Sequence, residues 1–83
     1  MHVTVISPAK AVLDAEADAV TAPAYDGQIG ILPRHAPFLT LLGEGPLVVR
    51  SGGEERTIEV RGGFLQVAND VVRIVAEHAE ETG

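Results

Sequence analysis

Residues 55–76 read ERTIEVRGGFLQVANDVVRIVA, which is three apolar runs separated by two short groups of turn-forming residues. Within the runs, apolar side chains tend to alternate with polar ones, which is the period of a strand with one buried face. Asn69-Asp70 indicates a two-residue hairpin turn, although Asp is less favourable than Gly at the second position. Arg61-Gly62-Gly63 predicts a second break. The predicted strands are 55–60, 64–68 and 71–76.

The same pattern extends over the rest of the chain, where turn-forming residues interrupt the alternation roughly every eight to twelve residues, the spacing of a small sandwich or barrel. Gly52-Gly53 indicates another two-residue hairpin. Counting the runs predicts an all-β fold of about nine short strands. The further strands are 3–6, 11–13, 20–22, 38–42 and 47–51, with one more apolar strand that Gly30 interrupts.

Two segments allow more than one interpretation. Asp14, Glu16 and Asp18 alternate with alanines, so a strand would place three carboxylates on one face, whereas an alanine-rich helical turn would spread them around its circumference. A cation site is conceivable there, but such alternation more often marks the solvated face of a strand. Residues 77–83 are polar and predict a frayed, solvated terminus.

Composition excludes several classes of protein. A chain of 83 residues makes a single domain. The sequence has no cysteine, which excludes disulfides, thiolate metal clusters and a cysteine nucleophile. Twelve acidic against six basic residues give a charge of -6, which repels phosphate backbones, so we expect no nucleic-acid partner. Only three residues are aromatic, so the core must consist of Val, Ile, Leu and Ala.

Catalytic and cofactor motifs are missing from the sequence. There is no G-x-S-x-G elbow, and His2, His35 and His78 are too far apart to predict a metal site, so we expect no enzyme, metal or cofactor. A lipoyl or biotinyl carrier domain needs a lysine at a hairpin tip, but Lys10 is the one lysine and follows Ser7-Pro8. With no long apolar segment and no signal peptide, the sequence is interpreted as that of a cytosolic protein.

The segment 25–37, YDGQIGILPRHAP, is the most unusual part of the chain. Pro33 and Pro37 restrict the backbone on both sides of Arg34-His35, and Gly27 and Gly30 allow a turn and a bend. A lone histidine in such a loop is usually only a turn residue. A stiff loop nevertheless loses little entropy on docking, so the segment predicts a protein-binding surface. A free-standing β-sandwich adaptor is one function that fits.

Residues 26–37 also resemble the G-x-x-G-I-x-P-x-H-A-P signature of the epsilon subunit of F-type ATP synthases. Residues 62–67, GGFLQV, are similar to the family's G-G-F-L-E-V, and residues 3–8 resemble its opening strand. The resemblance implies a flattened β-sandwich of about ten strands. It also implies a non-catalytic rotor subunit that binds the gamma subunit and the c-ring, with alpha, beta and delta subunits in the same complex. Through that complex, the resemblance implies, the protein lies peripherally on the cytoplasmic side of the inner (plasma) membrane.

The positions of this sequence that match the family's motifs imply two sets of contact residues, one for each partner. The residues expected to meet gamma are Ser7, Arg34, His35 and Thr40. Those expected to meet the c-ring are Asp26, Gly27, Gln28, Ile29 and Gly30. Gln28 stands where the family commonly has glutamate, so we expect Asp26 to supply the missing charge from the same side of an extended segment. Arg34 stands where many members have glycine.

Two further expectations follow. Longer family members continue into two α-helices that inhibit ATP hydrolysis, whereas this sequence ends at Gly83, so we expect those helices and their inhibition to be absent from this polypeptide. Binding two partners also requires a contiguous exposed apolar patch, for which Val20, Leu39 and Leu41 are candidates. A non-catalytic stalk subunit that couples proton flow to ATP synthesis is the leading hypothesis.

Overall fold

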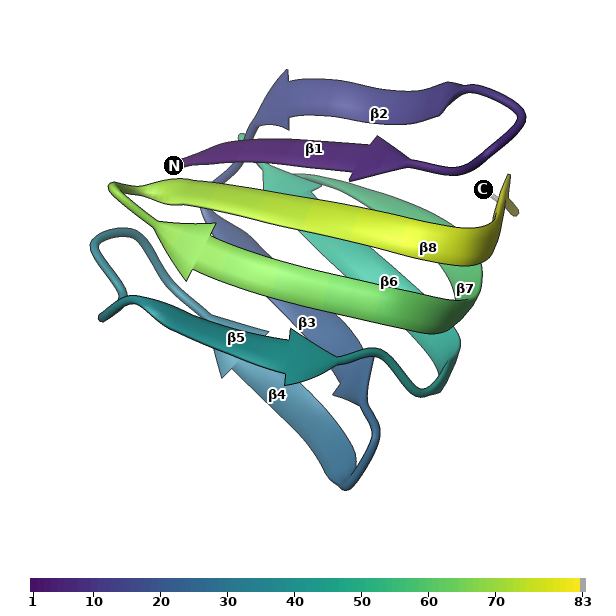
Figure 1. The fold of residues 1–83 in the computed structure, drawn as a ribbon. Coiled ribbons are helices and arrows are strands. Elements are labelled where there is room, and N and C mark those ends of the chain that lie inside the picture. Colours follow the sequence, from purple (N-terminus) through teal and green to yellow (C-terminus); the bar gives the residue numbers. More distant parts are fainter. Residues whose placement is uncertain (83) are drawn as a thin grey trace.

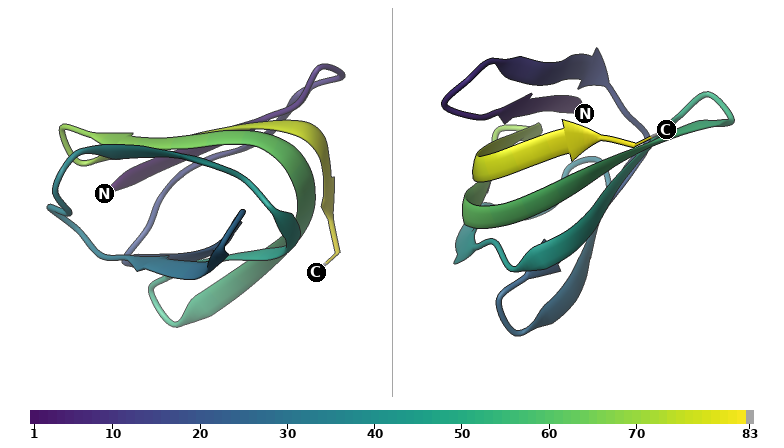
Figure 2. Two further views of the ribbon diagram at one scale, coloured as in Figure 1. Left: turned by 60° about the horizontal axis from the view of Figure 1, so that its bottom comes forward. Right: turned by 90° about the vertical axis from the view of Figure 1, so that its right-hand side faces the viewer.

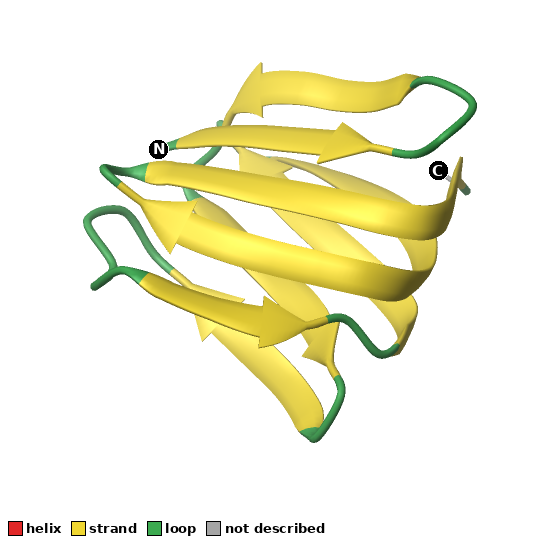
Figure 3. Ribbon diagram, in the orientation of Figure 1, coloured by secondary structure: helices red, strands yellow, loops and turns green. Residues whose placement is uncertain are grey.

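A computed structural model describes residues 1–82 as eight β-strands. These residues include no helix, and hence none able to cross a membrane (Figure 3). The strands are β1 (His2–Ile6), β2 (Ala11–Glu16), β3 (Ala19–Ala24), β4 (Gly27–Ile31), β5 (Phe38–Leu41), β6 (Glu44–Ser51), β7 (Glu54–Ala68) and β8 (Val71–Glu81).

The strands form two layers. Their hydrogen-bonded order is β2-β1-β8-β7-β6-β3-β4, and β5 pairs with β7. The front sheet consists of β2, β1, β8, the second half of β7, and β5; β6, β3 and β4 lie behind it with the first half of β7 and form the back sheet (Figures 1 and 2). This sandwich confirms the predicted all-β class.

Strand β7 belongs to both sheets because it bends at Gly62-Gly63. Its first half pairs with β6, whereas Phe64 to Val67 pair with β5. Gly62 and Gly63 have φ values of 70° and 102°, which disfavour any residue with a Cβ. The predicted break at this point is therefore wrong: two expected strands are one bent strand, which reduces the count from nine or ten to eight.

The core is aliphatic, as the low aromatic content predicts. Apart from Pro23, its buried side chains come from Val, Ile, Leu and Ala, and among residues 1–82 no polar side chain is buried. Alternation explains the packing of β8, in which Val72, Ile74 and Ala76 point inward. Val20 is also part of the core and is only 1% exposed, so its expected place in a surface patch is wrong.

Both predicted hairpins have the backbone of type I′ turns. Gly52 and Gly53 have φ values of 58° and 85°, and Asn69 and Asp70 have values of 53° and 61°. The pairing of Ala68 with Val71 confirms that Asn69-Asp70 forms a two-residue loop.

The two ambiguous segments are extended. Residues 11–16 form β2, so the helical alternative is wrong and Asp14 and Glu16 are exposed as one strand face predicts. The frayed terminus is also wrong as far as Glu81, because β8 pairs with β7 up to the Ile58–Glu81 pair. The Arg56 guanidinium donates two hydrogen bonds of 2.7 Å to Glu81, which fixes the end of β8. Gly83 lies outside the described residues.

Candidate protein-binding site

An apolar row crosses the outer face of the front sheet. Ile6 pairs with Val75, Val75 with Phe64, and Phe64 with Leu41, so four strands contribute neighbouring side chains. Leu39 lies on the same face of β5 as Leu41, and these two leucines are 67% and 62% exposed. The apolar row is defined as Ile6, Leu39, Leu41, Phe64 and Val75.

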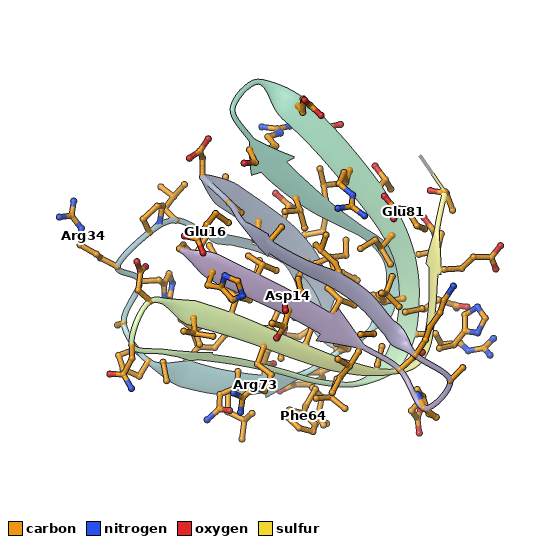
Figure 4. All side chains as sticks on the ribbon, turned by 90° about the horizontal axis from the view of Figure 1, so that it is seen from above. Asp14, Glu16, Arg34, Phe64, Arg73 and Glu81 are labelled. Carbon is orange, nitrogen blue, oxygen red and sulfur yellow. The ribbon has the colours of Figure 1, made fainter. Side chains whose placement is uncertain are left out.

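The apolar row is unusual for a sheet face that contacts water, because its side chains are apolar. Phe64 and Arg73 point away from the front sheet on one side (Figure 4), and polar residues such as Arg73 are the usual occupants of such a face. Phe64 has a shallow hollow on each side. One, of about 370 Å³, lies toward Ser7 and Pro8, and the other, of about 390 Å³, lies between Leu39 and Leu41. This surface can accept apolar side chains of a partner.

Ser7 and Thr40 lie beside the row, but their hydroxyl groups are engaged locally. The Ser7 hydroxyl donates to the carbonyl of Lys10 at 3.2 Å, within the β1–β2 loop. The Thr40 hydroxyl donates to the carbonyl of Leu41 at 3.4 Å, and its side chain is half-buried. Ser7 and Thr40, two of the four expected gamma contacts, therefore border a surface whose exposed groups are largely apolar.

Ile6, Phe64 and Val75 were not predicted from the sequence to be surface residues. A usable signal was present, because each of the three stands next to another apolar residue: the pairs are Val5-Ile6, Phe64-Leu65 and Ile74-Val75. Consecutive residues of a strand point to opposite faces. In each pair, one apolar side chain therefore lies in the core and the other lies on the outer face of the sheet.

Arg34 and His35 lie near the β7–β8 hairpin. The His35 N–H donates to the carbonyl of Leu32 at 3.2 Å and closes a turn with Pro33 and Arg34 at its centre. Imidazole Nδ1 of His35 lies 2.7 Å from the carbonyl oxygen of Ala36, so this nitrogen carries the hydrogen and donates it. Both bonds stabilise the loop from within.

The Arg34 N–H donates to the carboxylate of Asp70 at 2.8 Å and thereby holds the pKa of Asp70 below its usual value. The His35 ring packs against the ring of Phe38, with 5.0 Å between their centroids. Phe38 begins β5, so the turn is joined to the strand that carries Leu39 and Leu41.

The expected c-ring residues lie at the β3–β4 hairpin. Ala24 pairs with Gly27, so Tyr25 and Asp26 form the turn and Gly27 to Gly30 belong to β4. The segment is not extended at Asp26, so the expectation that Asp26 and Gln28 share one side of a continuous strand is wrong. Asp26 and Gln28 are both exposed, and Tyr25 is 68% exposed. The hairpin tip thus presents an aromatic ring, an amide and a carboxylate.

The hairpin tip adjoins one end of the apolar row. The Tyr25 N–H donates to the carbonyl of Leu41 at 3.1 Å, and the Gly43 N–H donates to that of Pro23 at 2.8 Å. These bonds connect the back sheet to β5. The hairpin tip therefore lies beside Leu41 at one end of β5, whereas Arg34 and His35 precede Phe38 at its other end.

Comparison with known proteins identifies the family. A sequence model described as the β-sandwich domain of the ATP synthase delta/epsilon chain matches residues 1–82. The chain belongs to this family. The family resemblance of the 26–37 segment is thereby confirmed, together with the β-sandwich fold.

Two curated relatives are named ATP synthase epsilon chain. The chain is 42% identical over 80 residues to that of Nitratidesulfovibrio vulgaris, covering 96% of this chain and 60% of that protein. It is 37% identical over 81 residues to that of Caulobacter vibrioides, covering 98% of this chain and 94% of that protein. This chain therefore spans only part of the first relative and nearly all of the second.

Two solved structures contain chains with a similar fold. A chain in the F1/c-ring structure of the Euglena gracilis mitochondrial ATP synthase matches 95% of this chain with a TM-score of 0.87 and 28% identity, over 51% of its own length. A chain in the Tetrahymena thermophila mitochondrial ATP synthase central stalk and c-ring matches 94% of this chain, over 63% of its own length, with a TM-score of 0.78. At 21% identity, the second match supports the fold alone.

Proposed function

We propose that this chain is the β-sandwich domain of a central-stalk subunit of an F-type ATP synthase. In this role it binds the gamma subunit and the c-ring, in a complex with alpha, beta and delta subunits, and helps to couple proton flow to ATP synthesis. It is a non-catalytic component, peripheral to the inner (plasma) membrane on its cytoplasmic side. The family match over residues 1–82 is the observation that carries the proposal.

The apolar row is the surface proposed to bind gamma. Its side chains are large and adjacent, and hollows on both sides of Phe64 offer shape for a partner to fill. Ser7 and Thr40, which the resemblance places at gamma, border the same surface. Burial of such a row removes apolar area from water and stabilises the complex.

Co-purification tests the assignment against the adaptor alternative. A tagged copy of this chain, expressed in its native cell, is expected to recover gamma together with the alpha and beta subunits. Recovery of a different protein without these subunits would favour a free-standing adaptor.

Replacing Leu41 tests the proposed gamma surface. Leu41→Gln is expected to weaken binding of purified gamma by about tenfold or more, because burial of a leucine contributes about 1.5–3 kcal/mol and 1.4 kcal/mol is a factor of ten. The side chain is 62% exposed, so folding is little affected. Calorimetric titration of gamma measures the change.

Tyr25→Gln is the matched control, because Tyr25 is equally exposed but lies on the β3–β4 hairpin. Its affinity for gamma is expected to equal that of the wild type. Equal losses in both variants, or none in Leu41→Gln, would contradict a gamma surface on the front sheet.

The hairpin tip is the surface proposed to meet the c-ring, with Asp26 supplying negative charge beside the neutral Gln28. Asp26→Asn is expected to weaken docking on isolated c-ring and to flatten its dependence on salt, since one charge contact is lost. Glu54→Gln, at the exposed end of the β6–β7 hairpin, is the control. An affinity unchanged by Asp26→Asn, or reduced equally by the control, would reject Asp26 as the c-ring contact.

A further inference from the structure

Arg34 occupies a backbone position that normally belongs to glycine. The bond from the His35 N–H to the Leu32 carbonyl closes a four-residue turn with Pro33 at its second position and Arg34 at its third. Proline at the second position and a positive φ at the third are features of a type II turn. Arg34 has φ 64°, a conformation that an L-residue with a long side chain rarely adopts.

Asp70 compensates for this conformation from another part of the chain. Its Oδ1 accepts the Arg34 N–H at 2.8 Å, a bond from a backbone donor to a charged acceptor. Asp70 is itself fixed in the β7–β8 turn at φ 61°, and its carbonyl accepts the His2 N–H at 3.0 Å. A rigid hairpin therefore holds the backbone of Arg34 across 36 positions of sequence.

The Arg34 side chain contributes nothing visible to the fold. It is exposed and points away from the protein (Figure 4). Among residues 1–82, its guanidinium has no hydrogen bond or ion pair, whereas Arg50 is paired with Glu55 and Arg56 with Glu81. A guanidinium projecting from a fixed backbone, on a chain of charge -6, has the properties of a binding group.

We propose that the Arg34–Asp70 bond presents the Arg34 guanidinium as an anchor for a carboxylate of the gamma subunit, with Asp70 as the positioning residue. The partner identity rests on the proposed function. A carboxylate suits this site because guanidinium binds carboxylates through two parallel hydrogen bonds. A single cation beside the acidic Asp70 lacks the cluster of basic residues that a phosphate-rich membrane surface requires.

The first test examines the bond in the isolated 83-residue chain. Asp70→Gly creates Asn-Gly, the most favourable type I′ turn, so it removes the acceptor while keeping the hairpin. Amide exchange at Arg34, measured by NMR, is expected to accelerate about tenfold or more in Asp70→Gly. Asp70→Asn keeps a neutral acceptor and is expected to give a smaller change. Unchanged exchange in Asp70→Gly would overturn the positioning role.

The second test measures binding of purified gamma. Arg34→Gly suits the turn but removes the guanidinium, and it is expected to weaken binding about tenfold and to reduce its salt dependence. Asp70→Gly is expected to weaken binding of gamma about threefold to tenfold. Arg34→Lys is expected to bind gamma more tightly than Arg34→Gly but more weakly than the wild type. Arg50→Gln, on the β6–β7 hairpin, is the control and is expected to bind like the wild type.

The outcomes separate the two proposals. If the wild type binds gamma and Arg34→Gly binds equally well, the anchor is overturned and the proposed function stands. If the wild type does not bind gamma, both the proposed function and the anchor are overturned. The exchange experiment judges the Arg34–Asp70 bond in either case.

Discussion

At the scale of single residues, the hydrogen that Gly63 has in place of a side chain decides how the two sheets are joined. A Cβ at this position would lie 1.9 Å from the carbonyl oxygen of Val75 and 2.9 Å from the Cα of Ala76. Neither backbone atom can move without disturbing the β7–β8 ladder. The bend of β7 therefore requires glycine both for its φ of 102° and for space.

Gly63→Ala is expected to destabilise the fold by about 2–4 kcal/mol, because it combines a left-handed backbone with a steric clash. Urea unfolding followed by circular dichroism measures the loss. Gly30→Ala is the control: a Cβ there meets no atom within 4 Å, and its effect is expected to stay within about 1 kcal/mol. Equal effects at both positions would contradict the role given to Gly63.

His2 lies between two carboxylates on the front sheet. Its ring nitrogens are 2.5 Å from Glu16 and 2.5 Å from Asp14. The hydrogen bond to Glu16 and then that to Asp14 raise the pKa of His2 above its usual value. The solvated carboxylate face was predictable from alternation, but its pairing with His2 depends on the β1–β2 register, in which His2 stands opposite Glu16.

The raised pKa of His2 predicts a dependence of stability on pH. The folded state favours the protonated imidazole, so the stabilisation is complete below the unfolded pKa of about 6.5 and is lost as pH rises through the folded value. Between pH 5.5 and pH 9, the melting temperature of the wild type is expected to fall by more than that of His2→Gln. The effect is small because the His2 side chain is 40% exposed and solvent screens its charge. A larger fall in the variant would contradict this sign.

At the scale of elements, turns were predictable where backbone conformation depends on one or two residues. Gly52-Gly53 and Asn69-Asp70 both indicated two-residue hairpins, and both are confirmed. Gly62-Gly63 consists of the same residue type, yet it bends a continuous strand. The difference lies in tertiary pairing with β8, which continues past the bend and which local sequence does not reveal.

Gly52→Asn is expected to stabilise the β6–β7 hairpin by about 0.4–1 kcal/mol. Gly52 has φ 58°, which asparagine tolerates in a type I′ turn, and a Cβ there meets no atom within 4 Å. Asparagine also restricts the unfolded chain more than glycine does. Thermal unfolding measures the gain. Gly52→Val, whose β-branched side chain disfavours this φ, is expected to destabilise, and the opposite order of the two variants would reject the argument.

At the scale of the whole molecule, composition and alternation predicted an aliphatic all-β domain, and motif resemblance predicted its family. Leu39 and Leu41 are exposed, as expected of a surface patch, whereas Val20, the third candidate, is buried. Alternation alone did not identify the other residues of the apolar row. The frayed terminus was predicted because residues 77–81 are polar, whereas backbone pairing with β7 and the Arg56–Glu81 ion pair hold them in β8.

Because β7 runs through both sheets, the two sheets are expected to unfold together. Separating the sheets would break this strand and part of its pairing with β8, and small domains without such a division usually unfold in one step. Native-state hydrogen exchange is expected to give equal free energies of opening for the slowest amides of β1, in the front sheet, and of β6, in the back sheet. Gly63→Ala is expected to lower both values by the same amount, because the bend is common to both sheets. A loss confined to one sheet would show that the bend joins two units that unfold independently.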